Sequence, residues 1–362
     1  IDLVTVKQTT GQPAAFLAGL TARVSSAAHI KEHAAIIYDK WLAREMIKTG
    51  TEIIEKSYSN DITEVMRSTR DVIEKKLLGV LGMNSFGIGI SDAGNKSLDQ
   101  YYKREQMIKQ GKRSGILSTF NTLDTYTAGW QPEQLIILAA RPAMGKTSIA
   151  ISFLMKAAAE GKSVAMYSLE MSAVKLTDKI ICSIADISLS DYKKGRLTDN
   201  ERLEAEHSID VLSEWNVNFN DNLLTDIDQI HASAQAIKSR SGLDLIIIDY
   251  LQLMKGSGNY SNREREVAEN SRKAKMMAVE LGCPVILLSQ LNRGLESRSD
   301  KRPMLSDLRE SGAIEQDADI VLFLYRESVY TDNADNTKGE IIIAKHREGP
   351  TGALDFFYNE SN

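Results

Sequence analysis

The chain has 362 residues, of which 43% are hydrophobic, and it carries a formal net charge of −5 at pH 7 and two cysteines. The length predicts two domains, and so few cysteines exclude a disulfide framework. The acidic balance excludes a surface that is basic throughout, so any contact with nucleic acid must be local. No run of about 18 apolar residues is present and no secretory signal opens the chain, so we expect a cytoplasmic protein with no membrane partner.

The first part of the chain, residues 14–81, has helical periodicity and almost no strand pattern. In residues 62–81, for example, apolar side chains recur at helical spacing, among them Ile62, Val65 and Met66. This pattern predicts a small, partial all-α N-terminal domain over residues 1–82.

A linker is expected over residues 83–117. Glycines gather between residues 82 and 94, which indicates a flexible connector. Ser97 is suited to cap a short linker helix that runs to Gln110 and is rich in basic residues. Two interpretations of this helix stay open: a solvated linker helix, or a helix that docks on a neighbouring subunit.

From residue 118 to residue 362, strand and helix patterns alternate. Continuous apolar strands such as Leu245–Ile248 indicate a buried, mainly parallel α/β sheet. The last two strands are close in sequence and are expected to form a hairpin at the edge of the sheet. The predicted strands are 134–140, 163–169, 216–220, 243–253, 284–290, 318–325, 340–345 and 353–358.

A phosphate-binding loop is predicted between the first of these strands and the helix that follows it. A strand, a tight glycine-containing loop and a helix N-terminus together direct backbone N–H groups and a helix dipole at a phosphate. Lys146 would reach the β- and γ-phosphates of ATP, and the Thr147 hydroxyl would bind Mg²⁺. Ala140 stands where the motif usually has its first glycine. The residues assigned to nucleotide binding are Ala140, Arg141, Pro142, Ala143, Met144, Gly145, Lys146, Thr147 and Ser148.

Three polar residues end other predicted strands of the same sheet. Asp249 follows a buried strand and is expected to hold the water shell of Mg²⁺; the alternative is a turn aspartate. Glu170 is expected one strand away from the γ-phosphate, where it would orient the attacking water; the alternative is a capping or surface glutamate. Gln290 would sense the γ-phosphate through a hydrogen bond, or would simply be a polar strand end.

Six segments, taken in order, resemble the DnaB family of replicative hexameric DNA helicases. The resemblance implies a RecA-like motor domain that uses ATP to move 5′ to 3′ on single-stranded DNA as a homohexameric ring and to unwind duplex DNA. It also implies a primase and a helicase loader as partners. The segments are Ala139–Thr147, Ser168–Met171, Ile248–Met254, Leu288–Arg293, Asp307–Asp319 and Ala344–Pro350.

The resemblance also supplies roles that spacing cannot give. Arg347 matches the arginine finger that enters the next subunit's site, and Lys345 matches its companion near the γ-phosphate. Arg309, Glu310 and Gly312 match the loop that tracks DNA. Two alternatives share the same core: a RecA-like recombinase that forms filaments, and an ATP-gated loader or adaptor that does not hydrolyse.

Overall fold

The structure is a computed structural model that divides into two compact units, residues 1–98 and 99–362. In the first unit, the described residues between 37 and 55 are helical, in keeping with the predicted all-α domain. The described residues are 37, 40–41, 43–48, 50–51, 54–55, 89–111, 114–221, 226–249, 251, 254, 263–308, 312–331 and 334–358.

The linker helix begins earlier than expected. Helix α6 spans Ile90–Lys109, so Ser97 lies inside the helix and does not cap it. The prediction gave too much weight to the glycines, one of which, Gly94, lies within α6. A glycine in a helix interior costs only about 1 kcal/mol relative to alanine, which a helix of this length tolerates.

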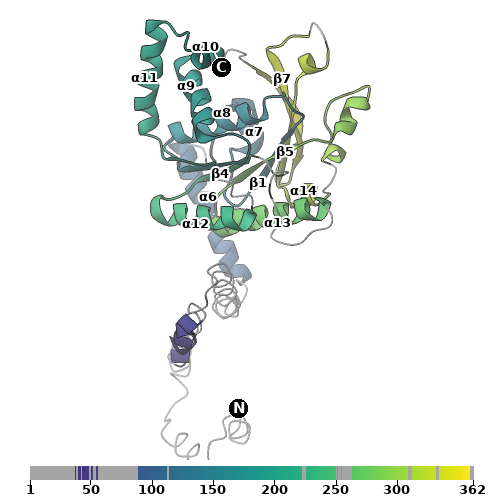
Figure 1. Ribbon diagram of the computed structural model, residues 1–362. Coiled ribbons are helices and arrows are strands. Elements are labelled where there is room, and N and C mark those ends of the chain that lie inside the picture. Colours follow the sequence, from purple (N-terminus) through teal and green to yellow (C-terminus); the bar gives the residue numbers. More distant parts are fainter. Residues whose placement is uncertain are drawn as a thin grey trace, which may run out of the picture. The chain divides into compact units, whose positions relative to one another are not determined.

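The described residues of the second unit form an eight-stranded sheet with the order β3-β2-β4-β5-β1-β6-β7-β8 (Figure 1). Strands β1 to β6 are parallel, and β7 and β8 add an antiparallel hairpin at one edge. Every predicted strand is present, although the prediction of 243–253 was too long because β4 ends at Asp249. The strands are β1 Leu135–Ala140, β2 Val164–Ser168, β3 Val217–Asn220, β4 Leu245–Asp249, β5 Val285–Gln290, β6 Ile320–Tyr325, β7 Lys338–His346 and β8 Gly352–Phe357.

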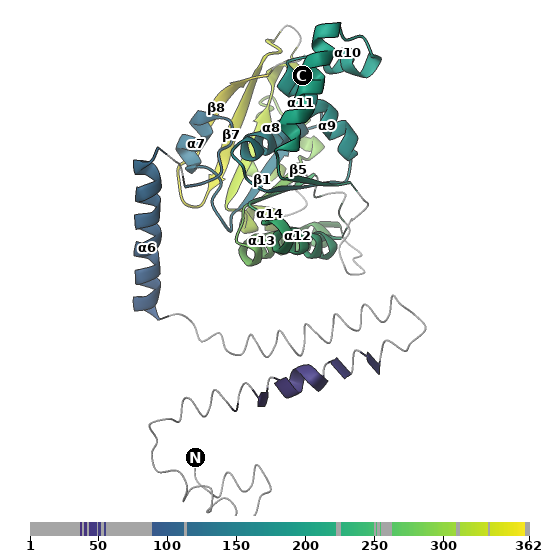
Figure 2. The same cartoon turned by 90° about the vertical axis from the view of Figure 1, so that its left-hand side faces the viewer.

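Helices cover both faces of this sheet, with α8 and α9 on one face and α12 and α13 on the other (Figures 1 and 2). Sequence reasoning did not foresee the short helix α7. The α-helices are α7 Asn121–Thr127, α8 Lys146–Ala159, α9 Ala173–Ala185, α10 Leu189–Lys194, α11 Asp199–Ser213, α12 Ile227–Ser241, α13 Arg263–Leu281 and α14 Gly312–Asp317. The 3-10 helices are η4 Arg293–Ser297, η5 Leu305–Asp307 and η6 Glu327–Val329.

Strand β1 lies at the centre of the core. Its residues Ile136 and Leu138 pack on the α8 side of the sheet, whereas Leu135 and Ile137 pack on the α13 side. Side chains alternate between faces because the strand repeat is two residues. Each fully buried apolar side chain contributes roughly 1.5–3 kcal/mol, so β1 holds the start of the following loop rigidly.

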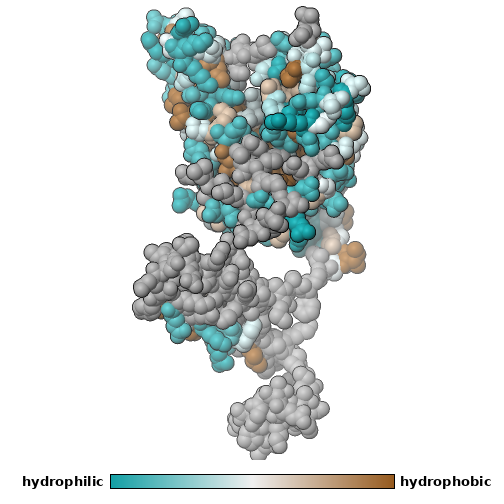
Figure 3. Space-filling model, turned by 45° about the vertical axis from the view of Figure 1, so that its right-hand side comes forward, coloured by the Kyte–Doolittle hydropathy of each residue, from teal (hydrophilic) through white to brown (hydrophobic). Residues whose placement is uncertain are grey.

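The surface of the second unit is mixed. On the face shown in Figure 3, hydrophilic residues dominate the coloured part and hydrophobic residues are scattered. Exposed apolar side chains include Val174, Leu203 and Phe357. Within the part of the chain that the structure describes, no helix has the length and apolar character needed to span a bilayer.

Candidate functional site

The predicted phosphate loop connects β1 to α8. Ala140 is the last residue of β1 and pairs with Gln290 of β5. Since Ala140 has extended backbone, which suits any residue, an alanine at the first glycine position of the motif carries no conformational cost. Ala143 has a φ of 65° and Gly145 a φ of 89°, both in the left-handed region. Glycine is suited to this region, and Gly145 is the residue that caps the start of α8.

The N-terminus of α8 faces the carboxyl edge of the sheet. Lys146 is the first residue of α8, so the first N–H groups of the helix and the positive end of its dipole lie at the loop. Space beside the loop is limited on one side, because a Cβ on Gly145 would lie 3.2 Å from the Tyr358 ring.

A cavity of about 350 Å³ opens over this loop. Glu170, which follows β2, and Gln290, which ends β5, both line it. The loop and two of the three predicted strand-end residues therefore line one cavity. The lining residues are Ala140, Arg141, Pro142, Ala143, Gly145, Lys146, Thr147, Ser148, Glu170, Lys179, Gln290 and Tyr358.

One part of the sequence prediction about Glu170 is wrong. Glu170 follows β2, and both β4 and β5 lie between β2 and β1 in the sheet, so the glutamate is not one strand away from the loop. Chain order does not set strand order here, because the crossover through α8 leaves two positions that later strands fill. Glu170 nevertheless lines the cavity, since the carboxyl ends of parallel strands share one edge.

Asp249, the last residue of β4, contacts the phosphate loop directly. The Thr147 hydroxyl donates a hydrogen bond of 2.9 Å to Asp249 Oδ2. Asp249 is fully buried, and its Oδ1 accepts no hydrogen bond from the residues that the structure describes. A hydroxyl and a carboxylate with an unused oxygen fit Mg²⁺, which prefers oxygen ligands. These two residues could hold the ion together with phosphate oxygens and water.

Burial also shifts the protonation equilibria of this site. Burial raises the pKa of the Asp249 carboxyl above its usual value, although the charge of Lys146 and the Thr147 hydrogen bond act in the opposite direction. Burial lowers the pKa of the Lys146 ammonium, opposed by the charges of Asp249 and Glu170. Desolvation thus disfavours the charged forms of both Asp249 and Lys146. A bound anion beside the ammonium and a metal ion beside the carboxylate would offset this desolvation cost.

Two of the nine residues assigned to nucleotide binding have side chains that are engaged elsewhere. Met144 is 2% exposed and packs in the core on the α8 side of the sheet. The Arg141 guanidinium contacts Glu296 and donates to the Leu291 carbonyl at 2.9 Å. Both residues therefore shape the loop through their side chains, and only their backbone is left to meet a phosphate.

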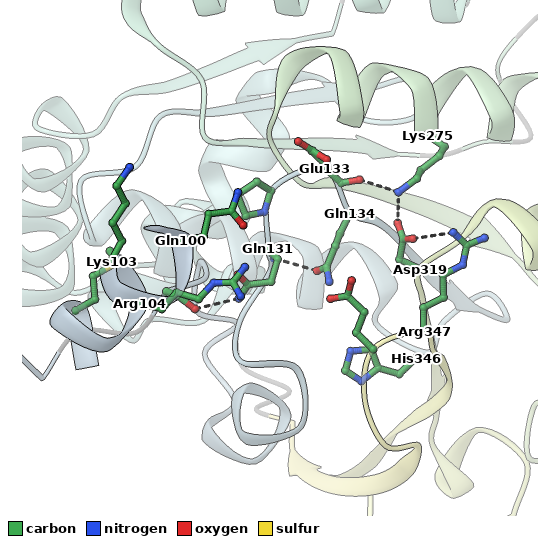
Figure 4. Close-up of a pocket in the computed structure, with 14 residues that line it drawn as sticks. Gln100, Lys103, Arg104, Gln131, Glu133, Gln134, Lys275, Asp319, His346 and Arg347 are labelled. Atoms are coloured by element: carbon green, nitrogen blue, oxygen red, sulfur yellow. Dashed lines mark hydrogen bonds and ion pairs between the residues drawn. The ribbon is translucent and has the colours of Figure 1, made fainter. Parts of the chain in front are cut away.

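Arg347 and Lys345 lie at the opposite edge of the sheet from the loop. Strand β7 is antiparallel to β6, and His346 pairs with Ile320, the first residue of β6. Arg347 binds the Asp319 carboxylate at 3.1 Å (Figure 4). Burial and the neighbouring charge of Arg347 lower the pKa of Lys345. A six-residue strand spans roughly 20 Å, so neither side chain reaches the loop of its own subunit.

Of the predicted DNA loop, only Gly312 falls within the described residues, where it begins α14. Arg309 and Glu310 lie outside them.

Two residues at the cavity were missed by sequence reasoning. Lys179, on α9, lies nine positions after Glu170 and lines the same cavity. Its position on the helix that follows Glu170 was the signal in the sequence that could have placed it there. Tyr358 follows β8, and Arg326 stacks on its ring at 4.2 Å. No local pattern marks Tyr358, because its place depends on how the terminal hairpin folds back.

Six parallel strands, a phosphate loop at the carboxyl end of the central strand and an antiparallel hairpin at one edge define the class of RecA-like ATPase domains. A family model described as the DnaB-like helicase C-terminal domain matches residues 115–362. The chain belongs to this family of replicative DNA helicases. It is a helicase that uses nucleotide, as the resemblance implied, and the comparisons give the recombinase and loader alternatives no support.

The relatives are similar along nearly the whole chain. The replicative DNA helicase DnaB of Geobacillus stearothermophilus is 38% identical over 359 residues, which cover 96% of this chain and 77% of the relative. The replicative DNA helicase DnaC of Bacillus subtilis is 38% identical over 357 residues, with the same coverage of 96% and 77%.

Solved structures agree with this assignment. A DnaB-like replicative helicase, described with its interactions with primase, has a TM-score of 0.80 and 29% identity, and the match covers 100% of this chain and 86% of that one. A second solved structure, described as an ATPase domain, has a TM-score of 0.69 and 34% identity, covering 74% of this chain and 95% of that one.

Proposed function

We propose that this helicase hydrolyses ATP with Mg²⁺ at the cavity over the phosphate loop, and that each site is completed by the next subunit of a homohexameric ring. The observation that carries the proposal is the placement of Arg347 and Lys345 at the sheet edge opposite their own loop. Cations at that edge cannot act within their own subunit, but a ring in which the subunits follow one another brings the two edges together.

Within the cavity, the described contacts support distinct roles for the lining residues. Lys146 and the α8 N-terminus would bind phosphate, and Thr147 and Asp249 would hold Mg²⁺. The ion would neutralise charge on the phosphates. Glu170 would accept a proton from the attacking water, and Gln290, which pairs with the end of β1, would detect the γ-phosphate.

Arg347 and Lys345 would serve the neighbouring subunit. Charge spreads over the transferred phosphoryl group in the transition state, and a guanidinium placed there lowers the barrier. Because the chain carries a net charge of −5, a few loops repeated around the ring would supply the contacts to single-stranded DNA. We assign this contact to Arg309, Glu310 and Gly312. We further propose that the ring moves along the strand in the 5′-to-3′ direction. Primase and a helicase loader are the expected protein partners.

The test is a mixing experiment. Lys146→Ala rings and Arg347→Ala rings should each be inactive in DNA-stimulated ATP hydrolysis. Mixed rings should regain part of the activity, because an Arg347→Ala subunit keeps an intact loop and a Lys146→Ala subunit keeps an intact finger. Subunit exchange is confirmed first by energy transfer between labelled rings. If exchange occurs without any recovery, Arg347 acts inside its own subunit and the ring model of the site is wrong.

A further inference from the structure

Asp319 lies in the short connection between α14 and β6, at the same sheet edge as Arg347. Its side chain is 11% exposed, and its two carboxylate oxygens serve different partners (Figure 4). Oδ2 accepts hydrogen bonds of 2.7 Å from the Leu135 N–H and from Lys275 Nζ, whereas Oδ1 accepts one of 3.1 Å from Arg347 Nη1. The carboxylate is therefore fixed by the core on one side and holds Arg347 on the other.

The main chain fixes the same pair. The Arg347 N–H donates to the Asp319 carbonyl at 2.9 Å, so the two residues stay in register. The Arg347 guanidinium also donates to the Gln316 carbonyl, and Lys345 Nζ donates to the Glu315 carbonyl. These carbonyls belong to the last turn of α14, where the helix dipole favours cations. Asp319 and the end of α14 thus form a cradle for the two cations.

A cradle of this kind matters because Arg347 is otherwise free to move. Its side chain is 45% exposed, and ordering a long arginine side chain costs up to about 2 kcal/mol of rotamer entropy. A finger that must enter another subunit's site would incur this cost at each encounter. Fixing the guanidinium beforehand removes most of it and sets the angle of approach.

The charges in the cradle also leave Arg347 able to act as a cation. Asp319 is shared between Lys275 and Arg347, with N···O distances of 2.7 and 3.1 Å. One carboxylate facing two cations leaves a net positive charge. The shorter contact goes to Lys275, so Arg347 is oriented without being neutralised.

We propose that Asp319 is a positioning residue for the arginine finger. It holds Arg347 in the orientation in which the guanidinium meets the phosphates bound by the adjacent subunit. The inference rests on the proposed action of Arg347 in trans, and it adds a residue that touches neither ATP nor DNA.

Asp319→Asn tests the inference, because asparagine keeps an oxygen for the Leu135 N–H while removing the charge that holds Arg347. We expect kcat for DNA-stimulated hydrolysis to fall roughly ten- to a hundredfold, with KM and nucleotide affinity within about twofold of wild type. The matched control is Lys273→Met, which removes a lysine of equal exposure on the same helix α13 whose ion pairs are with Asp228 and Glu269 and not with Asp319. Its kcat should stay within about threefold of wild type.

Mixed rings distinguish positioning from a structural role. Asp319→Asn subunits should recover activity when mixed with Lys146→Ala subunits, because the first keep an intact site and the second keep a correctly held finger. In an Arg347→Ala background, Asp319→Asn should not reduce the residual basal rate of hydrolysis any further, since the finger is already absent. Asp319→Glu keeps the charge but displaces the carboxylate, so it should show the same loss of kcat and the same recovery in mixed rings. It replaces Asp319→Asn in these assays if Asp319→Asn melts at a lower temperature than the wild type.

Each outcome supports or overturns the inference. Wild-type kcat for Asp319→Asn, alongside an inactive Arg347→Ala, overturns it while leaving the finger in place. A lack of recovery in mixed rings, or a further loss in the Arg347→Ala background, assigns Asp319 to the fold of its own subunit. An active Arg347→Ala ring would instead refute the proposed role of Arg347 as a finger. The mixing experiment under the proposed function tests that role separately.

Discussion

The Arg141 guanidinium donates hydrogen bonds of 2.8 and 2.6 Å to one carboxylate oxygen of Glu296, 155 residues further along the chain. Arg141 is 8% exposed and also donates to the Leu291 carbonyl. Leu291 directly follows Gln290, which lines the cavity over the phosphate loop. The pair therefore fastens the phosphate loop to the segment that carries Gln290, and it fixes the relative positions of two parts of the site.

Glu296→Gln should weaken ATP binding. A hydrogen bond to a charged group contributes about 1.5–3 kcal/mol, and the glutamate is 47% exposed, so we expect a loss near the lower end of that range. This corresponds to a roughly tenfold higher Kd for ATP, measured by titration calorimetry. The matched control is Glu160→Gln, which removes a partly exposed pair with Lys156 at the far end of α8. An unchanged Kd for Glu296→Gln would show that the loop holds its shape without this pair.

Glu170→Gln should separate binding from hydrolysis. The amide keeps the shape of the side chain but cannot accept the proton of the attacking water, so kcat should fall by roughly 10²- to 10⁴-fold. ATP affinity should hold, because the phosphates are bound by the loop and by Mg²⁺. Single-turnover hydrolysis and nucleotide titration measure the two quantities. If ATP affinity collapses together with kcat, Glu170 supports the structure of the cavity.

Asp249→Asn should make the nucleotide-free protein more stable and the enzyme inactive. Because burial raises the folded pKa of Asp249 above its ordinary value of 3.8, the folded chain binds more protons than the unfolded chain between these two values. The contribution of this group to stability therefore falls as the pH rises through that window. Asparagine avoids the cost and still offers an oxygen to Thr147.

Melting curves of the nucleotide-free variant between pH 4 and pH 8 test this sign. Its melting temperature should exceed that of the wild type at neutral pH, and the difference should shrink toward pH 4. Mg²⁺-dependent hydrolysis should fall at least about a hundredfold. Asp199→Asn is the control, since this aspartate is 90% exposed. A variant that melts lower at neutral pH would mean that the charge of Asp249 stabilises the apo fold.

The sequence was most informative where local patterns decide the structure. Buried apolar runs predicted every strand, and the strand ends predicted that Gln290 would share an edge with the phosphate loop. Asp249 beside Thr147 follows from the same rule. The beginning of α6 was predicted too late. The sequence reasoning took Ser97 as the cap and the glycines as a break, but a long helix tolerates a glycine such as Gly94 in its interior.

What the sequence could not predict depends on contacts between distant segments. The positions of β4 and β5 between β2 and β1 follow from sheet pairing, which no local pattern records. The direction of the Arg141 side chain is set by Glu296, and the place of Tyr358 by the terminal hairpin. In the sequence, Asp319 was only the last residue of the motif segment Asp307–Asp319. The structure shows that its carboxylate holds Arg347.

Arg309→Ala should weaken binding of single-stranded DNA more than it slows basal hydrolysis. In the sequence, Arg309 lies three positions before Gly312, which begins α14 and is not among the residues that line the cavity over the phosphate loop. A variant that makes fewer phosphate contacts releases fewer counterions when it binds. The plot of log affinity against log salt should therefore become shallower by about 0.7 for each contact removed. Affinity should also be largely independent of base sequence, because backbone contacts carry no sequence information directly.

Fluorescence anisotropy with labelled oligonucleotides over a series of salt concentrations measures both the affinity and the slope. Arg240→Ala is the matched control, since Arg240 is an exposed arginine in the last turn of α12 and its removal changes net charge by the same amount. If both variants weaken binding equally, the effect comes from net charge and not from a contact. If Arg309→Ala keeps wild-type affinity and slope, the DNA site lies elsewhere. The next candidate is then segment 255–265, whose sequence contains Lys255, Arg263 and Arg265.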